Sequence, residues 1–146
     1  MHFIRLRGPW RYEVLEQLEG DEALSREGKQ KLPADWSEVL GVGFRGTVRY
    51  RRTFHEPTGL ESGQEVWLSI DRVTSSATIQ LNENPLPPYD FSENPDTPWR
   101  QEVRDLLLPT SELIIDVSHP ADAKESGGLT GLVQLEIQTV RPRPVD

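Results

Sequence analysis

The sequence predicts an all-β protein built as an antiparallel sandwich or barrel. Six or more short segments alternate apolar and polar residues with the period of a half-buried strand. The 12 prolines and 11 glycines are spread between these segments as turns, with no low-complexity block. No segment keeps an apolar stripe at helical spacing over several turns. Many short alternating strands separated by turns are typical of sandwiches and barrels.

The alternation predicts each strand in turn. From Ile4 to Val14 the even positions are mainly apolar and the odd positions mainly charged, which indicates a first strand. Five further strands are expected over residues 47–54, 65–70, 77–82, 113–118 and 133–138. Within residues 12–24, Val14, Leu15 and Leu18 come close to helical spacing before Gly20, so a short helix is an alternative there.

The link from Leu86 to Trp99 is the longest expected irregular segment. Its four prolines are incompatible with a helix interior or a central strand. Its aromatic residues, Tyr89, Phe91 and Trp99, favour an ordered loop that packs on the core. Loops of this length often carry function, so a packed Ω-like loop and a ligand-contacting loop are both open alternatives.

Composition limits the function classes. The 146 residues fit one domain, expected to span 1–146. The net charge of −8 argues against a nucleic acid partner, because phosphate neutralisation needs clustered cations. The absence of cysteine excludes disulfides, thiolate catalysis and cysteine-based zinc sites. The short apolar runs give no reason to expect a membrane partner, and without an apolar leader near Met1 the default expectation is a cytoplasmic location.

No motif isolates a catalytic or metal site. The 24 acidic residues show no distinctive pairing, and His2, His55 and His119 are too far apart in sequence to suggest a shared site. We therefore predict no metal and no cofactor. Among the basic residues, Arg49 and Arg51 fall on the polar face of their strand and should pair with acids across it.

Arg52 falls instead on the apolar face of the same strand. A buried guanidinium needs a partner, so we predict a structural ion pair between Arg52 and Asp71, with Asp105 as the alternative partner. A less favoured alternative is that Arg52 faces a ligand groove and that the basic cluster of Arg45, Arg49, Arg51 and Arg52 binds an anionic ligand. The tryptophans divide in the same way. Trp10 is expected in the core, and Trp36 in the core or in a lid over it. Trp67 is out of phase with its apolar neighbours and should point away from the core, either covered by residues 12–31 or exposed as a platform.

The order of the segments adds a family resemblance. The strand GTVRYRRTF (46–54) precedes EVWLSIDRV (65–73) and ATIQLN (77–82), and Pro98-Trp99 and EVRDLL (102–107) follow. This order resembles the N-terminal sugar-binding domain of family 2 glycoside hydrolases, which include β-galactosidases, β-glucuronidases and β-mannosidases. The resemblance implies a galactose-binding-like jelly-roll sandwich. The family's Asn-Gly turn is replaced here by Asn82-Glu83-Asn84, in which we expect Asn84 to take the left-handed conformation.

The resemblance implies a non-catalytic carbohydrate-binding module. The family's catalytic residues belong to a separate (β/α)8 barrel of about 250 residues, for which this chain has no room, so we do not expect an enzyme. Aromatic and planar polar side chains grip sugars, and the candidates for ligand contacts are Trp67, Asn84, Tyr89, Asp90, Asp96 and Trp99.

Two other functions remain open. One is a scaffold or protein-interaction domain of the same fold with no sugar site. The other is a small enzyme, motivated only by the abundant carboxylates. The expected partners are a small saccharide or glycoside, a second copy of the chain, or a separate hydrolase subunit.

Overall fold

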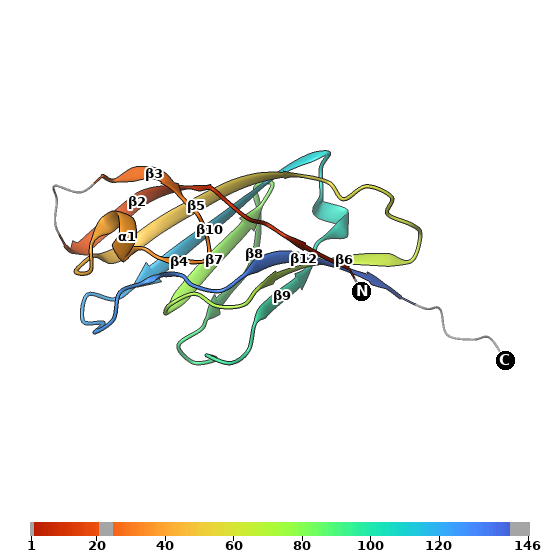
Figure 1. Ribbon diagram of the computed structural model, residues 1–146. Helices are drawn as coiled ribbons and strands as arrows, with labels where there is room; N and C mark the ends of the chain where they lie inside the picture. Colours follow the sequence, from red (N-terminus) through yellow and green to blue (C-terminus); the bar gives the residue numbers. More distant parts are fainter. Residues whose placement is uncertain (1, 21–24, 141–146) are drawn as a thin grey trace.

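The computed structural model describes residues 2–20 and 25–140, which form two antiparallel sheets (Figure 1). In strand order, the six-stranded sheet consists of β3 (Glu27–Gln30), β2 (Trp10–Glu19), β5 (Arg45–His55), β10 (Thr110–His119), β7 (Ser76–Leu81) and β8 (Asn84–Asp90). The four-stranded sheet consists of β1 (His2–Arg5), β12 (Val133–Thr139), β6 (Gln64–Ile70) and β9 (Trp99–Glu102). The predicted all-β class is confirmed.

Four short elements complete the described residues. Strands β4 (Ala34–Asp35) and β11 (Gly128–Leu129) pair with each other. The α1 helix (Ser37–Leu40) follows β4, and a 3-10 turn, η1 (Arg104–Leu106), connects β9 to the segment before β10. The sequence pattern had indicated none of these, because each is shorter than the window over which a period can be recognised.

The core lies between the two large sheets. Alternate residues of the central strands are buried and belong to one apolar cluster, which includes Val48, Tyr50, Leu113 and Ile115 from one sheet and Val66, Leu68, Ile70 and Leu135 from the other. The alternating positions predicted for residues 47–54, 65–70, 113–118 and 133–138 therefore face inward as expected. Two sheets that bury one face each against the other make a sandwich.

The first predicted strand is two strands in different sheets. Strand β1 pairs with β12, whereas β2 pairs with β5, and residues 6–9 cross between the layers. Trp10, fully buried, donates from Nε1 to the carbonyl oxygen of Leu6 at 2.9 Å, which fixes this crossing. Alternation continues through the crossing, so the pattern could not reveal it. The alternative of a short helix in residues 12–24 is wrong for residues 12–19, which belong to β2. Residues 21–24 lie outside the described residues.

The segment 86–99 is less irregular than predicted. Residues 84–90 form β8, and its three prolines are tolerated because β8 is an edge strand, where a missing N–H breaks no central hydrogen bond. Of the remaining irregular residues, Phe91 is buried in the core, whereas residues 92–98 are exposed. Trp99, which follows them, is buried, and its Nε1 donates to the carbonyl of Pro87 at 2.8 Å. The loop is therefore anchored to the core at its two ends.

The turn between β7 and β8 uses different residues from those expected. Asn82 and Glu83 have φ values of 49° and 68°, and Asn84 is an ordinary first residue of β8, so the prediction for Asn84 is wrong. A two-residue hairpin turn of this kind needs positive φ at both central positions. Asn82 is also tied by its side chain, which donates to the carbonyl of Leu106 and accepts from the N–H of Glu112 at 2.8 Å.

Candidate functional site

The six candidate ligand residues do not converge on one site. Trp67 lies on the outer face of the four-stranded sheet, away from the core as predicted. Its ring is half-buried under the guanidinium of Arg100 from β9, 4.8 Å from the ring centroid, and not under residues 12–31. Asn84 is exposed at the start of β8, in the other sheet.

The remaining four candidates lie around the end of β8. Trp99 is buried in the core, and Tyr89 is half-buried, packs edge-on against Phe91 at 4.6 Å, and donates its hydroxyl to the carbonyl of Thr97. Asp90 accepts hydrogen bonds from the hydroxyl and the N–H of Ser92, which lower its pKa, and Asp96 is exposed. These contacts hold the 91–98 loop in place. Ligand binding by the six candidates stays a prediction.

The expected ion pair between Arg52 and Asp71 is not formed. Arg52 donates from Nε to the carbonyl of Arg7 at 2.6 Å and from Nη1 to that of Thr53 at 3.1 Å. Asp71 lies in the link that precedes the first residue of β7. Arg52 pairs with Leu113 of β10, which in turn pairs with Leu81, the last residue of β7. The two side chains therefore belong to opposite ends of the sandwich. Arg52 is half-buried with no ion-pair partner among the described residues, and this burial lowers its pKa.

The other two strand arginines pair as predicted. Arg49 makes two hydrogen bonds to the carboxylate of Asp116, at 2.8 and 3.0 Å, and this interaction raises the pKa of Arg49. Arg51 lies 3.9 Å from Glu112, a loose contact between partly exposed groups. Both acids come from β10, directly beside β5. The tight pair neutralises Arg49, and the loose pair leaves Arg51 largely open to solvent.

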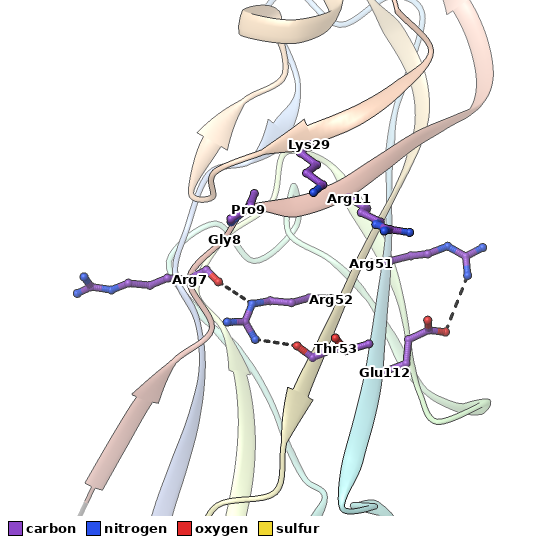
Figure 2. A pocket seen from close by; sticks show the side chains of 9 residues that line it. All are labelled: Arg7, Gly8, Pro9, Arg11, Lys29, Arg51, Arg52, Thr53 and Glu112. Atoms are coloured by element: carbon purple, nitrogen blue, oxygen red, sulfur yellow. Dashed lines mark hydrogen bonds and ion pairs between the residues drawn. The ribbon is translucent and has the colours of Figure 1, made fainter.

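Two adjoining hollows lie against β3, β2 and β5, the three neighbouring strands at one edge of the six-stranded sheet. The larger, about 710 Å³, is bounded by the residue 7–9 crossing and by β2, β3, β5 and β10, and Figure 2 shows its side chains. The smaller, about 410 Å³, continues toward Glu13, Glu27 and Arg49. Both are lined by Arg11, Lys29 and Arg51. We call this continuous surface the cationic groove.

Strand register places the three shared cations in one row. Arg11 of β2 is paired with Lys29 of β3 on one side and with Arg51 of β5 on the other. Arg51 and Arg52 are neighbours on β5 but extend in opposite directions (Figure 2). Arg7 contributes its carbonyl to Arg52, while its side chain extends away from the row (Figure 2). Arg11 and Lys29 were missed by sequence reasoning, because only the pairing of β2 with β3 and β5 brings them together.

A third hollow, of about 360 Å³, lies at the opposite ends of the strands of the six-stranded sheet. Its lining includes Asp90, Ser75 and His119. Nε2 of His119 lies 2.8 Å from the carbonyl oxygen of Glu125 and donates to it, and Nδ1 lies 2.7 Å from the hydroxyl of Ser75. His119 is buried and packs edge-on against Trp36, so this histidine joins the hollow to the core.

Residues 2–20 and 25–140 contain no cluster of three or more His, Asp or Glu side chains suited to a metal ion. Within the same residues, no helix is long and apolar enough to cross a membrane.

Comparison with solved structures identifies the fold. The chain aligns with a β-glucuronidase from Bifidobacterium dentium in complex with coumarin-3-O-glucuronide, with a TM-score of 0.71 and 17% identity, covering 93% of this chain and 30% of that one. A β-glucuronidase from an uncultured Clostridium gives a TM-score of 0.72 at 18% identity, with coverages of 94% and 29%. A putative β-galactosidase from Bacteroides fragilis gives a TM-score of 0.70 at 16% identity, covering 94% of this chain and 23% of that one.

No protein-family model matches the chain, and no curated protein matches it significantly. The chain spans 23% to 30% of the length of the three structures named above. Nearly the whole of this chain is therefore similar in fold to a minor part of much longer glycosidases. The expected galactose-binding-like jelly-roll sandwich is the fold that this chain shares with them.

Proposed function

We propose that this chain is a non-catalytic carbohydrate-binding module and that the cationic groove is its ligand surface. The observation that carries this proposal is the pair of adjoining hollows over β3, β2 and β5, which share the charged side chains of Arg11, Lys29 and Arg51. Small-molecule sites are concave and use a few placed polar groups to fix orientation. Glu13 and Glu27 offer acceptors for sugar hydroxyls, and Arg11, Lys29 and Arg51 offer donors.

The fold supports the same function class. The structures that share it are named as glycosidases, and one of them was solved with a bound glucuronide. Residues 2–20 and 25–140 form strands with one short helix and one 3-10 turn, and they do not contain the (β/α)8 barrel. We infer that it binds a saccharide without cleaving it. Absence of turnover on a panel of nitrophenyl glycosides is the expected result, and robust hydrolysis by the purified chain would contradict it.

Binding to this open surface should be weak. A methyl glycoside has about 13 non-hydrogen atoms, and about 0.3 kcal/mol per atom gives about 4 kcal/mol, which corresponds to a Kd near 1 mM. We would titrate the ¹⁵N-labelled chain with methyl glycosides of glucose, galactose, mannose and glucuronic acid and follow backbone amide shifts. Saturable shifts confined to β2, β3 and β5 are expected. No saturable shift with any of the four would refute the function.

A second candidate function is protein interaction through the outer face of the four-stranded sheet. Register places Phe3, Glu136 and Trp67 in one row across β1, β12 and β6, and Phe3 is 49% exposed. Contiguous exposed apolar patches mark contact surfaces, and these two aromatic side chains would be the apolar part of such a patch. A second copy or a separate hydrolase subunit would cover this face. Light scattering tests for the homodimer by measuring the mass of the chain and of a Phe3→Ser/Trp67→Ser variant. A dimeric chain and a monomeric variant are expected, and a monomeric chain would contradict the homodimer.

A further inference from the structure

The cationic groove concentrates positive charge on an acidic protein. The nine residues that line its larger hollow include five cations, Arg7, Arg11, Lys29, Arg51 and Arg52, and a single carboxylate, that of Glu112. Because the side chain of Arg7 extends away from the others (Figure 2), the remaining four cations and one carboxylate give a net charge of +3, whereas the whole chain carries −8. Such a local excess attracts a small anion, because a concave surface focuses the field of the charges that line it.

The row of Lys29, Arg11 and Arg51 is unfavourable in the absence of an anion. Like charges directly opposite each other on neighbouring strands are destabilising. Among residues 2–20 and 25–140, neither Arg11 nor Lys29 has an ion-pair partner within 4.0 Å, and the partner of Arg51 is 3.9 Å away. Glu13 and Glu27 form the next cross-strand pair on the same face, two residues along each strand from Arg11 and Lys29. Glu13 is also paired with Arg49 of β5. The row therefore lacks close counter-charge.

Arg52 adds donors at the edge of the same hollow. A guanidinium has five N–H donors, and the two hydrogen bonds to the carbonyls of Arg7 and Thr53 use two of them. Those carbonyls hold the side chain in place without neutralising it. The remaining donors are preorganised, and a preorganised site loses little conformational entropy when it binds.

We propose that the cationic groove binds the acidic group of an anionic saccharide, a uronate carboxylate or a sugar sulfate, on the row of Lys29, Arg11 and Arg51. This rests on the proposed carbohydrate-binding function and specifies its ligand. The oxyanion lies over the three cations, and the hydroxyls of the same sugar ring reach Glu13 and Glu27 in the smaller hollow. The net charge of −8 and the size of the hollows favour a short saccharide over a long polyanion.

The test compares two ligands that differ only in the acidic group. Methyl β-glucuronide carries a carboxylate where methyl β-glucoside carries a hydroxymethyl group. Charge-assisted hydrogen bonds are about twice as strong as neutral ones, so we expect the full chain to bind the glucuronide about tenfold more tightly or better at low salt. Raising the ionic strength should weaken the preference, because the site is open to solvent. Glucose 6-sulfate, titrated in parallel, shows whether the site prefers a sulfate to a carboxylate.

Variants assign the preference to the row. Arg11→Gln/Lys29→Gln should abolish it, and Arg11→Lys, which keeps the charge, should retain most of it. Arg5→Gln is the matched control, because Arg5 is also exposed on a strand but lies in the four-stranded sheet. In the unliganded chain at low salt, Arg11→Gln should not lower the melting temperature, since it removes repulsion.

The outcomes separate the two proposals. Equal binding of glucoside and glucuronide overturns the anionic-ligand inference and leaves carbohydrate binding intact. A preference that survives in the double variant also overturns the inference, because the acidic group then lies elsewhere. No binding of any saccharide, with or without binding of inorganic sulfate, overturns both. A preference lost in the double variant and kept in Arg5→Gln supports the inference.

Discussion

Gly127 lies against the ring of Trp36, and replacing it with alanine should destabilise the sandwich. A Cβ at this position would be 2.2, 2.6 and 2.8 Å from Cζ2, Cε2 and Cη2 of Trp36. Ordinary carbon contacts are about 3.5–4.0 Å, so the ring would have to shift by about 1 Å or more. The ring is fully buried and packs edge-on against Phe44 and His119, so it has no free space to enter.

The expected cost follows from this overlap. Overpacking of a filled core costs about 1–3 kcal/mol, and a rigid ring at this distance puts the variant at about 2 kcal/mol or above. For 146 residues the entropy of unfolding is about 0.3 kcal/mol per degree near the midpoint, so the melting temperature should fall by about 7 °C. Differential scanning calorimetry measures this directly.

Two further variants test the reasoning. Gly43→Ala is the control, because a Cβ there meets nothing within 4 Å, and its melting temperature should stay the same or rise slightly. Trp36→Phe shortens the side chain and removes the distal indole atoms Cζ2 and Cη2, so the double variant with Gly127→Ala should lose less stability than the two single losses added together. If Gly127→Ala melts at the wild-type temperature, the tight packing around Trp36 is refuted.

Three other outcomes are expected. Glu83→Gly should raise the free energy of unfolding by up to about 1 kcal/mol, because φ is 68° there and glycine adopts this angle without strain. The urea midpoint should rise accordingly, and a lower midpoint would contradict this. Trp67→Phe should remove most acrylamide-quenchable fluorescence, since the other three tryptophans are buried, and unchanged quenching would place the exposed ring elsewhere. Burial opposes the ionisation of Asp35, but its hydrogen bond from the Ser37 N–H at 2.7 Å and its other bonds outweigh burial and lower its pKa. The resulting stabilisation of the folded chain is present above about pH 4 and is lost as the pH falls through the lowered pKa. Asp35→Asn should therefore lower the urea midpoint at pH 7 and leave it equal to that of the wild type in acid. A difference in urea midpoint that stays constant with pH would refute this.

The sequence was informative wherever a local pattern decides the outcome. Alternation identified the central strands and the residues they bury, such as Tyr50 and Leu68, because successive side chains of a strand point to opposite faces. The same rule placed Trp67 outside the core and Arg49 opposite an acid of the neighbouring strand. The order of the segments predicted the fold that the structural comparison then showed.

The sequence failed at three places where the outcome depends on how distant segments are arranged. Alternation runs unbroken from β1 to Val14, although the chain changes sheet at residues 6–9. The prolines of β8 read as a loop because a pattern cannot show that a strand is at an edge. Arg52 was assigned a carboxylate partner, yet two main-chain carbonyls hold it, one of them 45 residues away.

The sequence by itself therefore determined the β-sandwich, its core and its acidic, cysteine-free surface. Only the tertiary structure decided which polar residues share a surface. Lys29, Arg11 and Arg51 belong to three strands and form a row because of the register between β3, β2 and β5. Register is set by the pairing of whole strands and the turns that join them, and a shift of one residue would turn a strand's side chains to the other face. The period of a segment fixes which of its residues share a face, whereas the neighbours of that face come from strands elsewhere in the chain.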